Sequence, residues 1–570
     1  MRVFFTFLVA SLLSLSATAK DRTESEMMKI AKQSLGMSVG TDARLYQSKA
    51  SATLSKLEST DQLNVYGAKG RGFVVIAKDD DFTPVLGYSD TDYESGNMPC
   101  GLKWWLRQVT ESLQARKAVG LTYQPAVYAT STATNFVKTS WNQEKPYNTL
   151  CPKINGTAAP TGCIATAMAQ IMYYYKYPTS GKGTGSYTVT ISKNNKKNYT
   201  CDINSTYAWS NMKEKYLSST KDVGNAVATL MRDAGAASDM NYELGGSGAS
   251  DFSAAIGFCD NFRYDSLALK RYDREFFADT EWMNLIRTEL EAKRPILYCG
   301  QDPVDGGHAF VFDGINEEDK VHVNWGWSGS GNGWYDVNVL KPTSYGGSGL
   351  SDGEGFNEFQ SMIFGFKTQE TPDATEKNTS LWGTSGYGFS VEDNKLQVSL
   401  IDAYNESFRW FDGVVDIVLK NVNDENDIQT VNLVDKKDWG LFAGGTGVSF
   451  TDNDDMVTYD LNEDFPKIAP GTYQLYLGSK STEESSYQYV RTVGGILTYT
   501  LTVNADGKMT VSEGEQITNG IASVTAPADN HLTKTYDLQG RALPTGSRLG
   551  QQGVVIIKQG NQVKKVLGHK

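Results

Sequence analysis

The chain has 570 residues and carries 54 Lys and Arg against 66 Asp and Glu, a formal net charge of −12 at pH 7. At roughly 100 to 200 residues per domain, this length predicts three or four domains. The acidic balance argues against a nucleic-acid-binding protein, which would carry a basic face, and six Cys are too few for a disulfide scaffold. With 40% hydrophobic and 21% charged residues, the composition is that of a globular protein.

The N-terminus has the pattern of an export signal. Arg2 provides the positive charge, residues 3–15 an apolar run, and residues 17–19 a small-residue cleavage site before Lys20. The apolar run is shorter than the ~20 residues that a membrane-spanning helix needs, and no other stretch approaches that length. We therefore expect residues 1–19 to be a cleaved signal peptide, no transmembrane segment, and a soluble, exported mature protein.

The residues after the signal are predicted to form an α+β block. The expected elements are a helix over 24–35, strands over 63–66 and 72–77, and a second helix over 102–115. Residues 124–138 are rich in Ala, Thr and Ser and have no apolar period. That composition is typical of a linker, where proteases cut readily.

Residues 139–366 mix helical and β-type patterns, which predicts an α+β domain. The helical periods cover 163–175, 223–235 and 279–293, and the β-type runs cover 307–315, 321–327 and 360–366. From 380 to 515, successive strands separated by turn clusters predict a β-sandwich, with strands over 396–404, 414–422, 471–479 and 495–503. The last stretch, from about 520, repeats the β pattern, and Gly560-Asn561 marks a hairpin turn.

Cys163 differs from the other five cysteines in its surroundings. It follows Thr161-Gly162 and opens an apolar helical run that ends before Pro178. A thiol at the N-terminus of a helix faces unsatisfied N–H groups and the positive end of the helix dipole, which favour the thiolate. Cys163 is therefore a candidate nucleophile, while a buried structural cysteine is the alternative role.

Histidines are scarce, which restricts acid-base chemistry at neutral pH to His308, His322, His531 and His569. His308 follows Gly306-Gly307 and precedes an apolar run, so we expect its imidazole at the mouth of a strand. His322 alternates with two valines and is predicted to be a surface or core residue, not a catalyst.

Three further residues are candidates to support a Cys–His pair. The strand predicted over 321–327 can pair with that of His308 as a hairpin and bring Asn324 or Trp325 beside it. An Asn side chain can hold the imidazole in the right tautomer without adding charge. Upstream, Gln143 is a candidate oxyanion donor, because a Gln side-chain N–H and the N–H of the nucleophile are the usual oxyanion hole of thiol peptidases.

No metal or cofactor site is predicted. The chain has no Cys-x-x-Cys pair and no cysteine spaced with a histidine like a zinc ligand set. The acidic clusters 424–427 and 452–455 lack the full Ca²⁺-binding EF-hand pattern, and we interpret them as solvated loops. Residues 36–40 match a Gly-x-Ser-x-Gly nucleophile elbow, but they follow a helix and not a strand, so we interpret the match as chance.

Four long motifs stand in order in the middle of the chain: W-x-Q-x-x-P-Y-N-x-x-C-P at 141–152, T-G-C-I-A-T-A-M-A-Q-I-M-x-Y at 161–174, G-G-H-A-F-V-x-D-G at 306–314 and H-V-N-W-G-W-x-G at 322–329. They resemble the streptopain/interpain family of papain-like cysteine peptidases. Before the linker, residues 73–76 and 84–89 resemble the inhibitory propeptide of that family. The resemblance covers about residues 20–366.

The resemblance implies roles for the candidate residues. Cys163 matches the nucleophile and His308 the general base, and Gln143 falls in the motif that supplies the oxyanion donor. Asn324 and Trp325 match the positions that orient or shield the imidazole. The implied activity is hydrolysis of peptide bonds through an acyl-enzyme. The implied partners are protein or peptide substrates and the protein's own propeptide, which acts as an inhibitor. Whether any of the remaining mature-part cysteines form disulfides stays open: Cys151, Cys201, Cys259 and Cys299.

Five parts are expected in the chain: a signal peptide over 1–19, an α+β inhibitory propeptide over 20–130, an α+β papain-like peptidase domain over 131–370, a β-sandwich over 380–515 and a small β module over 520–570. The activation cleavage is expected between about 120 and 138. The last part resembles C-terminal sorting domains of bacterial outer-membrane secretion machinery, the type IX route, and a plain β module is the alternative. The sorting interpretation implies an enzyme that is secreted or held at the cell surface.

The leading hypothesis is a secreted cysteine endopeptidase made as a zymogen. One alternative is a surface adhesin in which the peptidase-like domain is inactive and the segment 380–515 binds. A third is another acyl transfer by the same Cys–His pair, such as transamidation.

Overall fold

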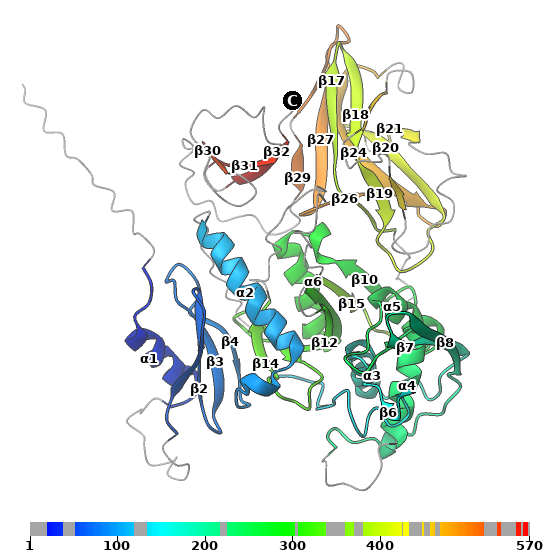
Figure 1. Ribbon diagram of the computed structural model, residues 1–570. Helices are drawn as coiled ribbons and strands as arrows, with labels where there is room; N and C mark the ends of the chain where they lie inside the picture. Colours follow the sequence, from blue (N-terminus) through cyan, green and yellow to red (C-terminus); the bar gives the residue numbers. More distant parts are fainter. Residues whose placement is uncertain are drawn as a thin grey trace, which may run out of the picture.

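The structure is a computed structural model, in which four blocks follow one another along the chain (Figure 1). We call them the N-terminal block (20–118), the central block (134–369), the strand-rich block (380–517) and the C-terminal sheet (533–567). The described residues are 20–37, 52–118, 134–216, 225–302, 306–337, 360–369, 380–424, 426–432, 447–449, 457–461, 468–512, 514–517, 533–536, 554–559 and 562–567. Outside them lie the expected signal peptide, most of the linker, the acidic cluster 452–455 and the hairpin turn 560–561.

The N-terminal block packs a short helix on an antiparallel sheet and ends in a long helix. Its elements are α1 (Glu24–Ser34), β1 (Ser55–Ser59), β2 (Leu63–Ala68), β3 (Gly72–Ala77), β4 (Val85–Ser89), η1 (Ser95–Asn97) and α2 (Cys100–Ala118). A capping box fixes the start of α1: the Thr23 side chain accepts from the Glu26 N–H, and the Glu26 carboxylate accepts from the Thr23 N–H at 2.7 Å. The helices and strands predicted for this block are confirmed, and α2 begins earlier than its apolar period indicated.

The central block contains the three helices predicted for it. Its elements are β5 (Lys153–Ile154), β6 (Thr157–Ala158), α3 (Cys163–Tyr175), β7 (Thr184–Ser192), β8 (Asn195–Asp202), η2 (Trp209–Asn211), α4 (Asn225–Ala237), β9 (Asn241–Tyr242), α5 (Asp251–Asp260), β10 (Lys270–Asp273), η3 (Arg274–Phe276), α6 (Asp279–Glu291), β11 (Ile296–Asp302), β12 (Gly306–Ile315), β13 (Lys320–Asn324), β14 (Gly333–Asp336) and β15 (Gln360–Phe364).

The central block differs from the sequence prediction in α5, a helix that was not predicted, and in two strand regions. The hairpin of β7 and β8 was not predicted, because most of its side chains are exposed and show no apolar alternation. The predicted strand 321–327 is shorter in the structure, where β13 ends at Asn324. The chain turns there because Gly326 adopts a φ of +68°, a conformation that glycine tolerates without strain.

One ten-stranded sheet runs through the N-terminal and central blocks, in the order β1-β2-β3-β4-β14-β13-β12-β11-β15-β10. The two blocks join where β4 pairs antiparallel with β14, with Tyr88 opposite Trp334. Backbone hydrogen bonds therefore connect the blocks in the same way that an added strand extends a sheet edge. In Figure 1, α2 lies between the strands of its own block and the central block, and its Trp104 and Trp105 are fully buried in a core that includes Phe310 and Tyr335 of the central block.

A second apolar core of the central block surrounds α3. Every residue from Ile164 to Met172 is buried. A helix that is apolar all round belongs inside a domain. It packs against β12 and α4, so its first residue is held by a rigid core.

The strand-rich block consists of strands in three sheets around one apolar core. The strands are β16 (Trp382–Thr384), β17 (Tyr387–Glu392), β18 (Lys395–Leu400), β19 (Asp402–Asn405), β20 (Gly413–Asn421), β21 (Ile428–Asn432), β22 (Gly447–Ser449), β23 (Val457–Asp460), β24 (Gly471–Ser481), β25 (Gln488–Tyr489), β26 (Arg491–Thr492), β27 (Ile496–Val503), β28 (Met509–Val511) and β29 (Glu515–Ile517). The strand predicted over 396–404 is divided into β18 and β19, which belong to different sheets. Residues of β18, β20, β24 and β27 meet in the shared core.

Charged contacts attach the strand-rich block to the central block. Arg491 donates to the carbonyl oxygen of Phe276 at 2.7 Å, forms an ion pair with Glu281, and stacks over the ring of Phe277 at 4.0 Å. Phe408 is buried in the core that surrounds α3. The two blocks therefore share contacts beyond the chain connection.

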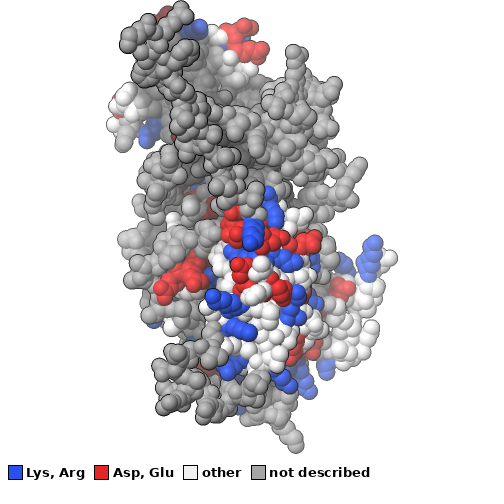
Figure 2. Space-filling view, turned by 90° about the vertical axis from the view of Figure 1, so that its left-hand side faces the viewer, with Lys and Arg blue, Asp and Glu red and all other residues white. Residues whose placement is uncertain are grey.

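Three antiparallel strands form the C-terminal sheet: β30 (Thr533–Tyr536), β31 (Val554–Gln559) and β32 (Gln562–Leu567). Gln559 lies opposite Gln562, as expected for a hairpin that turns at 560–561. Among the described residues, no helix is both long and apolar enough to cross a membrane. Figure 2 shows the side of the molecule that lies at the left in Figure 1, where acidic and basic side chains of the described residues are interspersed.

Candidate active site

Cys163 is the first residue of α3, as predicted. The preceding residue, Gly162, takes a φ of +87°. A Cβ atom at this position would lie 2.7 Å from the sulfur of Met240 and 3.0 Å from the carbonyl oxygen of Ser247. Glycine is required here for both its conformation and its lack of a side chain, and it directs Cys163 into the helix start.

Several influences act on the pKa of the Cys163 thiol. Burial is the largest and raises the pKa, and the neighbouring thiol of Cys100 acts in the same direction. Hydrogen bonds from the backbone of Ala309, Ile164 and Cys163 itself act in the opposite direction and lower the pKa. The expected support from the helix N-terminus is therefore present, but burial outweighs it.

His308 lies near the start of β12, next to Ala309, whose backbone is close to the Cys163 thiol. The backbone of Ala309 hydrogen-bonds to the Cys163 thiol. The ladder between β12 and β13 extends only to Val311 and Asn324, so β12 has no partner on that side at Ala309. The structure therefore brings Cys163 to the strand of His308 at the point where β13 diverges from it.

The backbone of Gln143 is held close to the segment that leads into Cys163. Its carbonyl oxygen accepts from the N–H of Thr161 at 2.9 Å, two residues before Cys163. Its own N–H donates to the side chain of Asn142 at 2.6 Å, and its side chain is half-buried. The segment around Gln143 thus borders the start of α3.

The buried Asn324 side chain bonds to loops around the site. It donates to the carbonyl oxygen of Thr139 at 2.6 Å and accepts from the N–H of Gly326 at 3.1 Å. Thr139 in turn donates to Gln170 of α3 at 2.8 Å. Asn324 therefore ties the end of β13 to the chain that leads into the site.

Trp325 is buried against the strand of His308. Its ring contacts Phe310 at 4.7 Å and Tyr335 at 5.3 Å, and its indole N–H donates to the Gly331 carbonyl oxygen at 2.9 Å. Trp325 therefore lies next to β12, the strand that carries His308.

The first turn of α2 covers this part of the site, which the sequence did not predict. A Cβ at Gly101 would lie 2.6 Å from Trp325 and 3.2 Å from Phe310. Trp104 packs against Gly300, whose missing Cβ would lie 2.3 Å from its ring. Gly300 is paired with His308, so both residues face the same side of the sheet, which is the side of α2. The sequence feature that could have indicated this contact is Pro99-Cys100-Gly101 directly before a Trp-rich helix.

His322 belongs to a buried pair outside this group, as a core residue rather than a surface one. Its Nδ1 lies 2.5 Å from the Asp313 carboxylate, which also accepts from the N–H of Val137 at 2.8 Å. In the sequence, the one indication of this pair is Asp313, a charged residue within the apolar run 309–315.

None of the six cysteines, all of which lie in the described part of the chain, forms a disulfide. Among the described residues, the cluster spaced to hold a metal is Asp79, Asp80 and Asp81, which includes no candidate active-site residue.

Known protein families match the same parts of the chain, the N-terminal and central blocks. The model of the Peptidase C10 family matches residues 141–335, and that of the Spi protease inhibitor matches residues 19–113. Streptopain of Streptococcus pyogenes is 32% identical over 375 residues, which cover 61% of this chain and 90% of streptopain.

Two further relatives are similar to the same part of the chain. The thiol protease/hemagglutinin PrtT of Porphyromonas gingivalis is 31% identical over 350 residues, which cover 58% of this chain and 39% of PrtT. Among solved structures, a fragment of prointerpain A from Prevotella intermedia is 33% identical, with a TM-score of 0.47, and covers 55% of this chain and 98% of the fragment. The two family models together match most of the N-terminal and central blocks.

Proposed function

The chain belongs to the streptopain family of cysteine peptidases, the peptidase C10 family, and we propose that it is an exported endopeptidase that cleaves proteins through Cys163 and His308. The observation that supports this pair most directly is the position of the Cys163 thiol, at the start of α3, by the backbone of Ala309, the residue that follows His308 in β12. Family membership makes the chain a cysteine-type endopeptidase, so the alternative with an inactive peptidase-like domain is not retained.

The proposed reaction begins with the Cys163 thiolate attacking the carbonyl carbon of the scissile peptide bond. The N–H of Cys163 and the side-chain amide of Gln143 donate to the oxyanion. His308 transfers a proton to the leaving amine, which breaks the peptide bond and leaves an acyl-enzyme. His308 then takes a proton from water, which attacks the thioester and releases the second product and the free thiol.

The N-terminal block is proposed to keep the enzyme latent in two ways. Its strand β4 extends the catalytic sheet through β14, and the first turn of α2 packs on Trp325 and on the face of β12 that carries His308. Substrate access and free movement of His308 then require this block to leave. The proposed boundaries are a propeptide over 20–130, cut between about 120 and 138, and a peptidase domain over 131–370.

The remaining parts are proposed to serve export. Residues 1–19 would be removed as a signal peptide. Residues 380–515 would form a β-sandwich, and 520–570 a C-terminal module that addresses the protein to outer-membrane secretion machinery. The enzyme would then be secreted or held at the cell surface.

Peptide hydrolysis by the processed protein tests the proposed function. Wild-type protein, activated under reducing conditions, is expected to hydrolyse a fluorogenic peptide and to lose this activity on treatment with a thiol alkylator. Cys163→Ala is expected to be inactive, whereas Cys259→Ala, which changes another buried thiol, is expected to remain active. Hydrolysis that persists in Cys163→Ala, or amine incorporation in place of hydrolysis, would contradict the proposal.

A further inference from the structure

A buried glutamate of the strand-rich block reaches the catalytic sheet. Glu406 follows β19 directly and is only 4% exposed. Its carboxyl group lies 3.5 Å from the guanidinium of Arg271, a buried residue of β10. Because β10 is the last strand of the ten-stranded sheet, Glu406 meets the end of the sheet that lies opposite to the N-terminal block.

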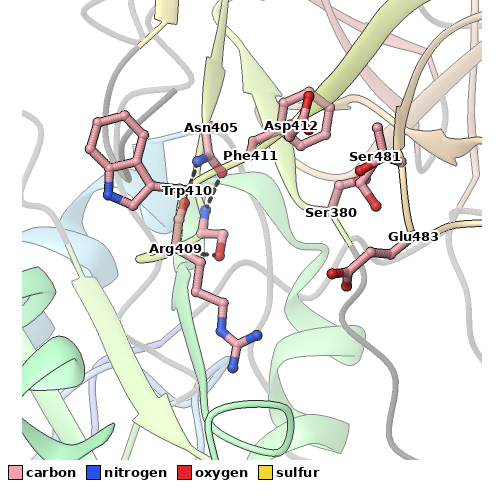
Figure 3. Close-up of a pocket in the computed structure, with 10 residues that line it drawn as sticks. Ser380, Asn405, Arg409, Trp410, Phe411, Asp412, Ser481 and Glu483 are labelled. Carbon is pink, nitrogen blue, oxygen red and sulfur yellow. Dashed lines mark hydrogen bonds between the residues drawn. The ribbon is translucent and has the colours of Figure 1, made fainter. Parts of the chain in front are cut away.

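The turn that carries Glu406 is fixed within the strand-rich block. The N–H of Glu406 donates to the carbonyl oxygen of Leu381 at 2.9 Å. The Asn405 side chain closes the turn, since it donates to the carbonyl oxygen of Arg409 at 2.7 Å and accepts from the N–H of Ser407 at 3.0 Å (Figure 3). The strand-rich block therefore sets the position of the Glu406 carboxyl group.

Carboxyl groups from both blocks surround Arg271. Its guanidinium donates to Asp273 at 2.7 Å and to Asp251 at 2.8 Å. Burial raises the pKa of Glu406 well above its usual value, and Asp273, to which Glu406 hydrogen-bonds, acts in the same direction. Protonated Glu406 donates to Asp273 and avoids placing a third negative charge beside one guanidinium.

From Asp273, one row of residues runs across four neighbouring strands to the active site. Asp273 of β10 lies opposite Ser361 of β15, which lies opposite Cys299 of β11. Cys299 in turn lies opposite Ala309 of β12. Residues directly opposite one another in an antiparallel sheet point to the same face. The row ends at Ala309, whose backbone is close to the Cys163 thiol.

Polar contacts link the side chains along this row. The buried Ser361 hydroxyl donates to Asp251 at 2.6 Å, and the same oxygen of Asp251 accepts from Arg271. Burial raises the pKa of the Cys299 thiol, the Cys163 thiol acts in the same direction, and a hydrogen bond with Ser361 opposes them. A continuous set of polar groups thus leads from the strand-rich block to the nucleophile.

We propose that Glu406 is a positioning residue of the peptidase, through which the strand-rich block holds the outer strands of the sheet and thereby keeps His308 in place beside Cys163. This inference rests on the proposed function and adds a role for the strand-rich block within it. Loss of the Glu406 side chain removes one partner of Asp273 and of Arg271, so the outer end of the row can shift. Because a misplacement of about 1 Å can cost about 10² in rate, the expected effect is on kcat.

The test measures kcat and KM for hydrolysis of a fluorogenic peptide by the activated full chain. Glu406→Ala is expected to lower kcat about tenfold and to change KM less than about twofold. Glu406→Gln is expected to keep kcat within about twofold of the parent, because its amide can donate to Asp273 and accept from Arg271 as the protonated acid does. A loss of kcat in Glu406→Gln equal to that in Glu406→Ala would overturn the proposal.

Glu281→Ala is the matched control, because it breaks the ion pair with Arg491, which joins the same two blocks through α6. It is expected to keep the kcat of the parent, although it also weakens the attachment of the strand-rich block. An equal loss of kcat in Glu281→Ala and Glu406→Ala would show a general effect of attachment and would overturn the assigned role of Glu406.

Ser361→Ala interrupts the row without changing the strand-rich block, and it is expected to lower kcat as Glu406→Ala does. The double variant is expected to lose less than the product of the two single effects, because both side chains act through one row. Parent kcat in Ser361→Ala would overturn the proposal, and this result decides it if thermal unfolding shows that Glu406→Ala does not fold. Parent kcat in Glu406→Ala refutes this inference alone, whereas a parent protein that does not hydrolyse the peptide refutes the proposed function and this inference with it.

Discussion

The pKa of the Cys163 thiol is subject to opposing influences. The helix start and the surrounding backbone donors favour its thiolate, while burial raises the pKa of the thiol and outweighs them. Because Cys100 of the N-terminal block is one of the groups that raise the pKa, departure of this block removes part of the restraint. Thiol reactivity is therefore expected to rise on activation.

At the residue scale, Gln143→Ala is expected to lower kcat by about 10² to 10³, the usual cost of removing one oxyanion donor. KM should change less, because the oxyanion forms only in the transition state. Steady-state hydrolysis of a peptide by the processed variant measures both values. Glu144→Gln, an exposed neighbour, is the control, and a KM effect with unchanged kcat in Gln143→Ala would refute the assigned role.

At the element scale, the contact between α2 and the central block depends on a missing side chain. Gly101 places the helix backbone directly on Trp325 and Phe310. The adjoining β4–β14 pairing needs only backbone groups, so its sequence carries little specific signal. The helix contact is therefore the part of the latent arrangement that a single substitution can disturb.

Gly101→Ala is expected to weaken latency, because its Cβ would lie 2.6 Å from the Trp325 ring. The precursor should show a shorter lag before activity appears in a continuous peptide assay. Gly96→Ala serves as the control, since a Cβ there meets no atom within 4 Å. After processing, both variants yield the same mature sequence, so equal final activities and equal lags would show that this contact does not contribute to latency.

At the scale of the whole molecule, charged and partly buried groups join the strand-rich and central blocks. Arg271 is buried with Asp251, Asp273 and Glu406, and Glu406 comes from the strand-rich block. Burial raises the pKa of Glu275 nearby to about 7, with Asp273 acting in the same direction. Stability of the assembled blocks is therefore coupled to pH.

Glu275 has a pKa near 4.5 when unfolded and about 7 when folded, so its contribution to stability is complete below about pH 4.5 and is lost as the pH rises through 7. Glu275→Gln stays neutral. The difference between its melting temperature and that of the parent Cys163→Ala protein is expected to grow in favour of the variant as the pH rises from 5 to 8. Differential scanning calorimetry measures this difference, Glu317→Gln at an exposed position is the control, and a difference that does not change with pH would refute the assignment.

The sequence alone determined the helix that begins at Cys163, the strand of His308 and the order of the blocks, and it proposed the nucleophile, because local motifs and apolar periods are properties of adjacent residues. It did not show that Gly101 lies on Trp325, that β4 continues the catalytic sheet, or that His322 pairs with Asp313. These are contacts between residues far apart in the chain or on different strands. Only the tertiary structure decided them, because strand register, shape complementarity and burial select one such contact among many with similar local patterns.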